Sequence, residues 1–269
     1  MRRSYRITDI ICGEHYITSR IYPEYTQPKG SRSKKSKPTS ETRAALNDKN
    51  KKEYLAHLAS TNFTQKDYYI TLTYNDEHLP ENYDAAVHEL RKFINRAKYR
   101  ANKKGKELKT IAVTGFGSKR KRLHHHLIMS GCFLPWEIVD LWRDRDGNGR
   151  GRVDTSALQF DQFGVAIDNL LSYFYKHIEE ARANGVKGSC YYRSRNNLKE
   201  PEYRSRKGKL SHKQIEWAKT YTDFEVFERM HPDYALADVS TFYNDTNGGY
   251  YFTVRYYKPP HRHRRKRNE

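Results

Sequence analysis

The chain has 269 residues, and its 51 Lys and Arg against 32 Asp and Glu give a formal net charge of +19. No apolar run reaches the length of a membrane-spanning helix, and the amino-terminal segment MRRSYRITDI lacks the apolar stretch of a signal peptide. A large positive charge with 13% aromatic residues favours a polyanion with stackable bases, so we expect nucleic acid, and no membrane, as the partner. The three cysteines have no metal-type spacing, which favours a reducing compartment and hence a cytoplasmic location.

Apolar residues are concentrated in the middle of the chain. Leu, Ile, Val and Phe make up 29 of the 112 residues from 67 to 178, but 21 of the other 157. We therefore expect one ordered core with polar flanks. Apolar periodicity predicts these elements along the core: strand 67–74, helix 84–105, strands 110–116 and 122–130, helix 135–142, strand 152–160 and helix 166–185. This order predicts an α+β fold, with an antiparallel sheet and helices packed on one face.

The flanks are polar and basic. We expect a helix over 40–60, a further helical stretch over 212–230 and a strand over 249–258. The chain is divided into a basic amino-terminal extension with a helix, a core, an aromatic and basic carboxyl-terminal extension, and a basic tail. The expected bounds of these four parts are 1–66, 67–185, 186–260 and 261–269.

Three consecutive histidines lie in the middle of the strand expected over 122–130. Side chains alternate along a strand, so His124 and His126 share one face and His125 points to the other. Two imidazoles two residues apart on a strand can hold one divalent cation. A surface histidine cluster, or one buried and hydrogen-bonded histidine, would give the same pattern, and a metal site needs at least one further ligand.

The last core helix carries a tyrosine and a lysine three residues apart. Tyr173 and Lys176 are three residues apart, so they share one face of this helix, on the side away from its apolar stripe. A tyrosine hydroxyl, whose pKa is ordinarily about 10, becomes a useful nucleophile when a metal polarises its target and a cation stabilises the phenolate. In a chain with 22 tyrosines, a half-buried structural aromatic is the competing interpretation.

Together these motifs resemble those of the HUH endonucleases, in which two histidines flank a hydrophobic residue. DYYITLTYNDEHLP resembles their first motif, LHHHLIM their metal motif and LLSYFYK their tyrosine motif. The chain is most similar to the rolling-circle replication initiators of small single-stranded DNA phages and related mobile elements, over about residues 67–178.

The resemblance implies a ferredoxin-like or RRM-like antiparallel sheet with the two histidines at its centre. It implies a nickase that depends on Mn²⁺ or Mg²⁺, with His124 and His126 as metal ligands and Tyr173 as the nucleophile. Tyr173 would attack single-stranded DNA at a replication origin, leaving a 5′-phosphotyrosine and a free 3′-OH for the host replication machinery. Lys176 would lie near the phosphate or the phenolate. For a phage-encoded protein, the location would be the host cytoplasm.

Three positions depart from the family pattern. A glutamate ligand is usual in the strand before the histidines, but Gly115 stands there. Another acid, such as Asp76 or Glu77, or water therefore takes the place of the third ligand. If neither does, the activity is impaired. The residue between the two histidines is His125 rather than a hydrophobic one, which a hydrogen bond can accommodate. Asn169 stands where two-tyrosine members have their first tyrosine, so we expect a single-tyrosine mechanism.

Two basic segments are expected to bind nucleic acid. One is the turn before the histidines, and the other interleaves aromatic and basic residues after the last core helix. Aromatic rings stack on bases and cations neutralise phosphates, which suits single strands, although a solvated turn would explain the first segment equally well. The candidate residues are Lys119, Arg120, Lys121, Arg122, Tyr192, Arg193 and Arg195.

Two functions stay open at this point. The first is the nickase, and the second is a catalytically impaired protein of the same fold that binds an origin or single-stranded DNA without cutting it. The charge and the aromatic segments support both, whereas the histidine pair together with Tyr173 and Lys176 favours the enzyme. A basic RNA-binding or ribosomal protein would leave the pairing of these motifs unexplained.

Overall fold

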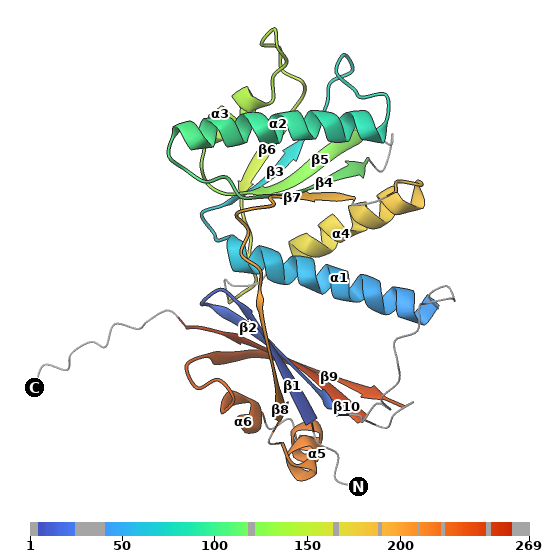
Figure 1. Cartoon of the computed structure of the whole chain (residues 1–269), viewed down its shortest axis with the longest axis vertical. Coiled ribbons are helices and arrows are strands. Elements are labelled where there is room, and N and C mark those ends of the chain that lie inside the picture. The colour runs from blue at the N-terminus through green and yellow to red at the C-terminus, as the bar shows by residue number, and fades with distance from the viewer. Residues whose placement is uncertain are drawn as a thin grey trace, which may run out of the picture. The chain divides into compact units, whose positions relative to one another are not determined.

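The computed structural model describes residues 5–24, 41–117, 122–163, 167–187, 190–208, 210–221, 224–245 and 249–259. The chain forms two compact units, one made of Asp48–Lys199 and the other of Met1–Asn47 together with Glu200–Glu269. Figure 1 labels the helices and strands of both. The middle of the chain thus forms one unit, and its two ends together form the other.

The unit Asp48–Lys199 is built on a five-stranded antiparallel sheet with the order β6-β3-β5-β4-β7. Its strands are β3 (Tyr68–Leu72), β4 (Thr110–Phe116), β5 (Leu123–Met129), β6 (Val153–Ala157) and β7 (Tyr191–Arg193). Its helices are α2 (Tyr83–Lys103), α3 (Pro135–Leu141), α4 (Asp168–Ala183) and most of α1 (Glu41–Asn62). The three histidines therefore lie on the middle strand of the sheet.

Helices cover both faces of this sheet (Figure 1). On one face, Ile70 and Leu127 pack with Phe93 of α2 and with residues of α3. On the other face, Val113 and Ile128 pack with residues of α1 and α4. The two apolar layers are contributed by alternate residues of the same strands, as the pleat of a sheet requires.

The α+β class is confirmed, and each strand and helix expected between 67 and 185 is present, with ends shifted by a few residues. The expectation of helices on one face is not met, because α2 and α3 cover one face and α1 and α4 the other. The cause lies in the central strands. TIAVTGF and LHHHLIM carry apolar side chains on both faces, and each apolar face must be covered.

Helix α4 forms because Leu171, Phe174 and Ile178 recur at helical spacing, and all three are buried in the core. The helix ends at Ala183, and Gly185 follows with a φ of 82°, a left-handed conformation that favours glycine. This apolar stripe sets which side of α4 is turned toward the sheet.

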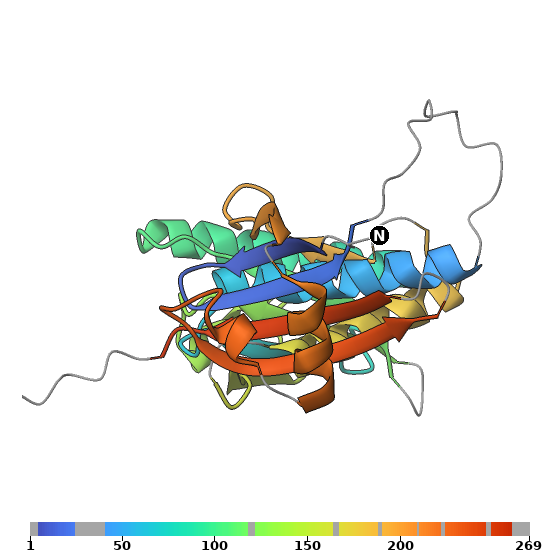
Figure 2. The ribbon, with the colours of Figure 1, turned by 90° about the horizontal axis from the view of Figure 1, so that it is seen from below.

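The second unit has its own antiparallel sheet, with the order β8-β1-β2-β10-β9. Its strands are β1 (Tyr5–Cys12), β2 (Tyr16–Pro23), β8 (Glu202–Gly208), β9 (Ala235–Asn244) and β10 (Gly249–Tyr257). Helices α5 (His212–Tyr221) and α6 (Glu225–Glu228) supply Ile215 and Phe227 to a core shared with Ile21 and Phe252. Figure 2 shows both helices in front of this sheet.

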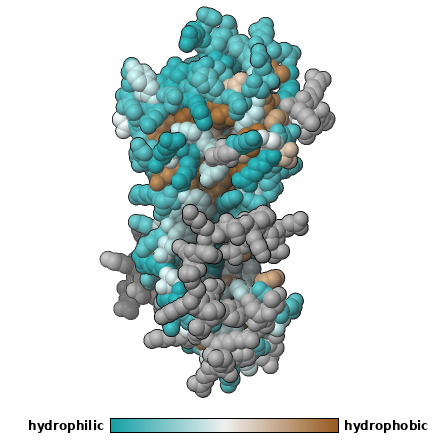
Figure 3. All heavy atoms as spheres, turned by 45° about the vertical axis from the view of Figure 1, so that its right-hand side comes forward, coloured by the Kyte–Doolittle hydropathy of each residue, from teal (hydrophilic) through white to brown (hydrophobic). Residues whose placement is uncertain are grey.

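Hydrophilic residues cover most of the face of the unit Asp48–Lys199 that is drawn in Figure 3, and apolar residues appear as bands between them. This surface fits the high content of charged residues, 31% of the chain. Among the described residues, no helix has both the length and the apolar character to cross a membrane.

Candidate metal centre and tyrosine site

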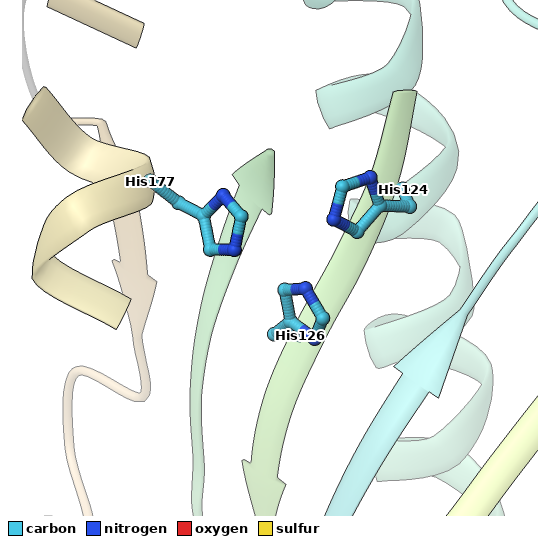
Figure 4. Close-up of side chains that lie close together, drawn as sticks. All are labelled: His124, His126 and His177. Carbon is cyan, nitrogen blue, oxygen red and sulfur yellow. The ribbon is translucent and has the colours of Figure 1, made fainter. Parts of the chain in front are cut away.

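Three histidine rings converge between β5 and α4 (Figure 4). His124 and His126 project from the same face of β5, as strand alternation predicts, and their ring centroids lie 4.7 Å apart. His177 of α4 lies 5.3 Å from the ring of His124 and 4.8 Å from that of His126. One ligand atom from each of the three lies within 4.8 Å of the others, so this histidine cluster could hold a metal ion. Metal–nitrogen bonds of about 2.1 Å place tetrahedral donors about 3.4 Å apart, so small side-chain rotations would close the cluster on an ion.

Each of the three rings is held by hydrogen bonds at its Nδ1 atom. His124 donates from Nδ1 to the carbonyl oxygen of Arg122 at 3.1 Å, and His177 donates from Nδ1 to a carboxylate oxygen of Glu180 at 3.2 Å. Nδ1 of His126 is hydrogen-bonded to the hydroxyls of Tyr69 at 2.7 Å and Thr71 at 3.1 Å. In His124 and His177, the donating Nδ1 leaves the lone pair on Nε2, which is the usual arrangement behind a metal-bound histidine. Nε2 of His126 lies 3.4 Å from the hydroxyl of Tyr173, a contact that a metal ion would replace.

Nε2 of His177 is buried and has no hydrogen-bond partner among the described residues. A buried nitrogen without a partner is costly, so such an atom at the point where three rings meet indicates a missing ligand. The histidine cluster therefore fits a divalent ion by its donor atoms as well as by its spacing.

Two of the three histidines, His126 and His177, are held in the neutral form. Burial lowers the pKa of His126 to about 2, with a further contribution from the neighbouring histidines. Burial also lowers the pKa of His177, and the neighbouring His124 lowers it further. Neutral imidazoles are the form that binds a metal, so the protein holds these two ligands ready without a competing proton.

Tyr173 lies beside the cluster. Its hydroxyl is 3.4 Å from Nε2 of His126, and its ring meets those of His126 and His177 edge-on at 5.0 and 4.6 Å. The side chain is 42% exposed, so a substrate in solvent can reach it. Burial raises the pKa of Tyr173, and the charge of Glu180 raises it further, so the phenol is protonated at neutral pH. Lys176, one turn along α4, is exposed and lies 3.9 Å from Glu180.

The structure thus brings together His124, His126 and Tyr173, which the sequence analysis placed in one site. It adds His177, which that analysis did not single out. The spacing contained the information, because His177 is four residues after Tyr173 and such pairs lie on the same side of a helix. His125 points to the opposite face of the sheet, where it is hydrogen-bonded to Tyr74 at 2.7 Å and Thr114 at 2.9 Å.

Gly115 lies directly across from His124 in the β4–β5 pairing. A Cβ at this position would lie 2.4 Å from Nδ1 of His177, so the imidazole fills the space of a side chain there. Asp76, one of the two acids expected to replace the family's glutamate, forms an ion pair with Arg122. Within the described ranges, neither Asp76 nor Glu77 belongs to the cluster.

The candidate nucleic-acid residues fall into two groups. Lys119, Arg120 and Lys121 lie outside the described residues, and Arg122 also donates to the carbonyl oxygen of Tyr74 at 3.0 Å. A cavity of about 860 Å³ beside α2 and β7 is lined by residues that include Tyr192, Arg193, Arg195, Arg91 and Lys98. Tyr192 packs against the core on the α2 face, so this cavity lies on the face of the sheet opposite the histidine cluster.

Residues 67–187 match the sequence model of a family described as replication-associated protein ORF2. This segment is similar to replication-associated proteins. It contains the histidine cluster and Tyr173. The match agrees with the replication-associated family that the motifs resemble, over 121 of the 269 residues, and the HUH mechanism itself stays a prediction. No curated protein and no solved structure matches the chain.

Proposed function

We propose that this chain initiates replication by nicking single-stranded DNA at an origin, with Tyr173 as the nucleophile and a divalent metal ion at the histidine cluster. The observation that carries the proposal is the position of the Tyr173 hydroxyl, 3.4 Å from a ring nitrogen of the cluster. Both lie within the segment similar to replication-associated proteins. A nucleophile next to a metal site is the arrangement that metal-assisted phosphoryl transfer needs.

His124 and His126 would hold the ion through Nε2, as Mn²⁺ or Mg²⁺. When bound, such an ion offsets negative charge on the phosphate oxygens and so lowers the barrier to attack by an anion. The hydrogen bond from Nδ1 to the Arg122 carbonyl fixes the tautomer of His124, and the hydroxyls of Tyr69 and Thr71 hold the ring of His126 in place.

In the reaction, the phenolate oxygen of Tyr173 forms a bond to phosphorus while the bond from phosphorus to the 3′ oxygen breaks. The electron pair of that bond leaves with the 3′ oxygen, which takes up a proton and becomes the free 3′-OH, while the 5′ phosphate stays on the tyrosine. Because the pKa of Tyr173 is raised, its proton must be removed and the phenolate stabilised. Lys176, one turn along the same exposed side of α4, would place a cation near the phenolate or the phosphate.

The DNA strand would be held by charge and by stacking. A net charge of +19 favours a polyanion. The cavity beside α2 combines aromatic rings with cations as single-strand binding surfaces do, and because it lies on the face opposite Tyr173 it would hold a part of the strand away from the cleaved phosphate. The host replication machinery would then extend the 3′-OH. These partners fit a protein that works in the cytoplasm of its host.

The test is covalent capture of DNA. Wild type, Tyr173→Phe and His126→Ala are incubated with Mn²⁺ and an end-labelled pool of single-stranded oligonucleotides of random central sequence, then run on denaturing gels. We expect an adduct with the wild type that needs Mn²⁺ and is lost in both variants. Tyr175→Phe is the matched control, because Tyr175 lies on the same helix with its hydroxyl on Asp48, and it should retain the adduct.

The alternative function gives a different result. DNA binding with no adduct from any protein, at every metal tested, would favour a non-cutting single-strand or origin-binding protein. Sequencing of the captured strands would identify the cleavage sequence if the adduct forms.

A further inference from the structure

We propose that His177 takes the coordination position left without a carboxylate at Gly115, and that this all-nitrogen site prefers first-row transition-metal ions to Mg²⁺. The inference rests on the proposed function only for the role of the ion in DNA cleavage. It concerns, however, the chain's own ligands and can be tested without DNA.

The first argument is space. A side chain at position 115 would meet Nδ1, Cε1 and Cγ of His177 at 2.4, 2.8 and 2.9 Å, closer than any real contact. The ring of His177 therefore lies over β4 where a residue larger than glycine would place its side chain. Glycine at 115 and histidine at 177 are mutually dependent, because either the strand or the helix can fill this position, but not both.

The second argument is the donor atom. His177 is buried, with its Nδ1–H donated to Glu180 and its Nε2 without a partner among the described residues. A carboxylate behind a histidine fixes its tautomer and raises its basicity as a ligand. Glu180 is thus a positioning residue, and Nε2 of His177 is the third donor.

The third argument is the place of the ligand in the chain. His177 and Tyr173 are four residues apart on α4, and their rings are in contact at 4.6 Å. A ligand on the strand would fix the ion to the sheet alone. A ligand on α4 ties the ion to the helix that carries the proposed nucleophile, so metal binding also fixes the position of the Tyr173 hydroxyl.

The choice of ion follows from the ligands. Mg²⁺ prefers oxygen donors and is usually held through one or two carboxylates, whereas imidazole nitrogen suits Zn²⁺ and its neighbours in the first transition row. Three imidazoles with no carboxylate among the donors should therefore bind in the order Mg²⁺ < Mn²⁺ < Co²⁺ < Zn²⁺. The sequence analysis expected either Mn²⁺ or Mg²⁺. Without a carboxylate ligand, the site should favour Mn²⁺ over Mg²⁺.

The experiment is a titration of the full chain, free of DNA, with Mg²⁺, Mn²⁺ and Co²⁺ in a calorimeter. The proteins are wild type, His177→Ala, Gly115→Glu and the double variant, with His78→Ala as a matched histidine outside the cluster. His177→Ala should weaken Co²⁺ and Mn²⁺ binding by more than about 10-fold. Removal of a residue that only supports a metal ligand already costs about 10-fold or more, and removal of a ligand itself should cost at least as much. His78→Ala should bind like the wild type.

Gly115→Glu alone should also lose binding, because its side chain collides with His177. The double variant, which carries both Gly115→Glu and His177→Ala, replaces the imidazole by a carboxylate. It should therefore regain Mn²⁺ binding and bind Mg²⁺ more tightly than the wild type does. Unchanged affinity in His177→Ala, or equal affinity of the wild type for Mg²⁺ and Co²⁺, would overturn the proposal.

A measurement on the wild type covers the case in which a variant fails to fold. Nitrogen-15 spectra of the histidine side chains, recorded as Zn²⁺ is added, should show the Nε2 resonances of His124, His126 and His177 shifting together. Shifts confined to His124 and His126 would overturn the proposal. The proposed function is tested by a different result. If metal binds as described but no covalent adduct with DNA forms, the proposed function is wrong and the assignment of His177 as a ligand stands.

Discussion

Each of the two units buries a group of polar side chains that includes histidine, but the two groups are built differently. In the unit formed by the chain's ends, Ser19 Oγ donates to Asp9 Oδ1 at 2.5 Å, and Nε2 of His231 lies 3.3 Å from the same oxygen. Arg206 donates to the other carboxylate oxygen from two of its nitrogens, both at 3.3 Å. Both oxygens of this buried carboxylate are therefore paired.

In the histidine cluster, by contrast, three imidazoles meet with no carboxylate between them, and Nε2 of His177 stays without a partner in the described part of the chain. A buried polar group whose members pair with one another is complete and serves the fold. A group that leaves a donor atom unpaired at its centre is incomplete until a ligand binds. The comparison assigns a structural role to Asp9, Ser19 and His231 and a binding role to the histidine cluster.

The comparison predicts the largest effect for His126→Ala. This change removes a proposed metal ligand whose Nε2 lies 3.4 Å from the Tyr173 hydroxyl, so adduct formation should fall by about 100-fold or more. In the wild type, Mn²⁺ at 100 times its Kd should raise the free energy of unfolding by about 2.7 kcal/mol. Calorimetric unfolding with and without Mn²⁺ measures this stabilisation, which His126→Ala should lack. Equal stabilisation of the wild type and the variant would mean that the ion binds elsewhere.

Asp9→Asn tests the other half of the comparison. It should lower the free energy of unfolding by about 1–3 kcal/mol near neutral pH, because Ser19, His231 and Arg206 lose a charged acceptor. Metal affinity should not change, since Asp9 belongs to the other unit. Urea unfolding and a Mn²⁺ titration of the same preparation measure the two effects, and weaker Mn²⁺ binding would break the assignment.

The pH dependence of the Asp9 effect has a definite sign. Burial raises the pKa of Asp9, but hydrogen bonds from His231 and Ser19 and the charge of Arg206 outweigh it and hold the pKa below its ordinary value. A depressed pKa in the folded state adds stability above the unfolded pKa of about 3.9 and loses it as pH falls through the folded pKa. The difference between wild type and Asp9→Asn should therefore shrink below about pH 4. A constant difference would argue against the pairing.

Tyr192→Ala should have the smallest effect. Tyr192 lines the cavity on the face opposite the histidine cluster and is already partly buried, so we expect a loss of about 1 kcal/mol in single-strand affinity, roughly fivefold. Metal binding should be unaffected. Fluorescence anisotropy with a labelled oligonucleotide measures the loss, and Tyr99→Ala, an exposed tyrosine of α2, is the control. Equal losses in both variants would mean that the cavity is not where DNA binds.

The local features of the site could be predicted from the sequence because they depend on periodicity. Alternation along LHHHLIM placed His124 and His126 on one face of a strand, and helical spacing placed Tyr173 and Lys176 on one face of a helix. The contact between α4 and β4 could not be predicted in this way. His177 and Gly115 are 62 positions apart in the chain, and their packing depends on how a whole helix lies across the sheet.

The second sheet was not predicted, for a related reason. The segments of β1 and β8 are rich in charged and polar residues, and YRITDIIC and EYRSRKG lie about 200 positions apart in the chain. Ile7 pairs with Arg206 and Asp9 with Arg204, so the sheet is formed by partners that no local pattern links. Non-local strand pairing of this kind leaves only a weak trace in a single sequence.

The most direct test of the central claim is to map which residue carries DNA after reaction of the wild type with Mn²⁺ and single-stranded oligonucleotides. The adduct is digested with nuclease and protease, and the peptides are sequenced by mass spectrometry. The account predicts one modified peptide, with a 5′-phosphonucleotide on Tyr173. A nucleotide on Tyr175 or on another of the 22 tyrosines, or cut DNA with no nucleotide left on the protein, would contradict it.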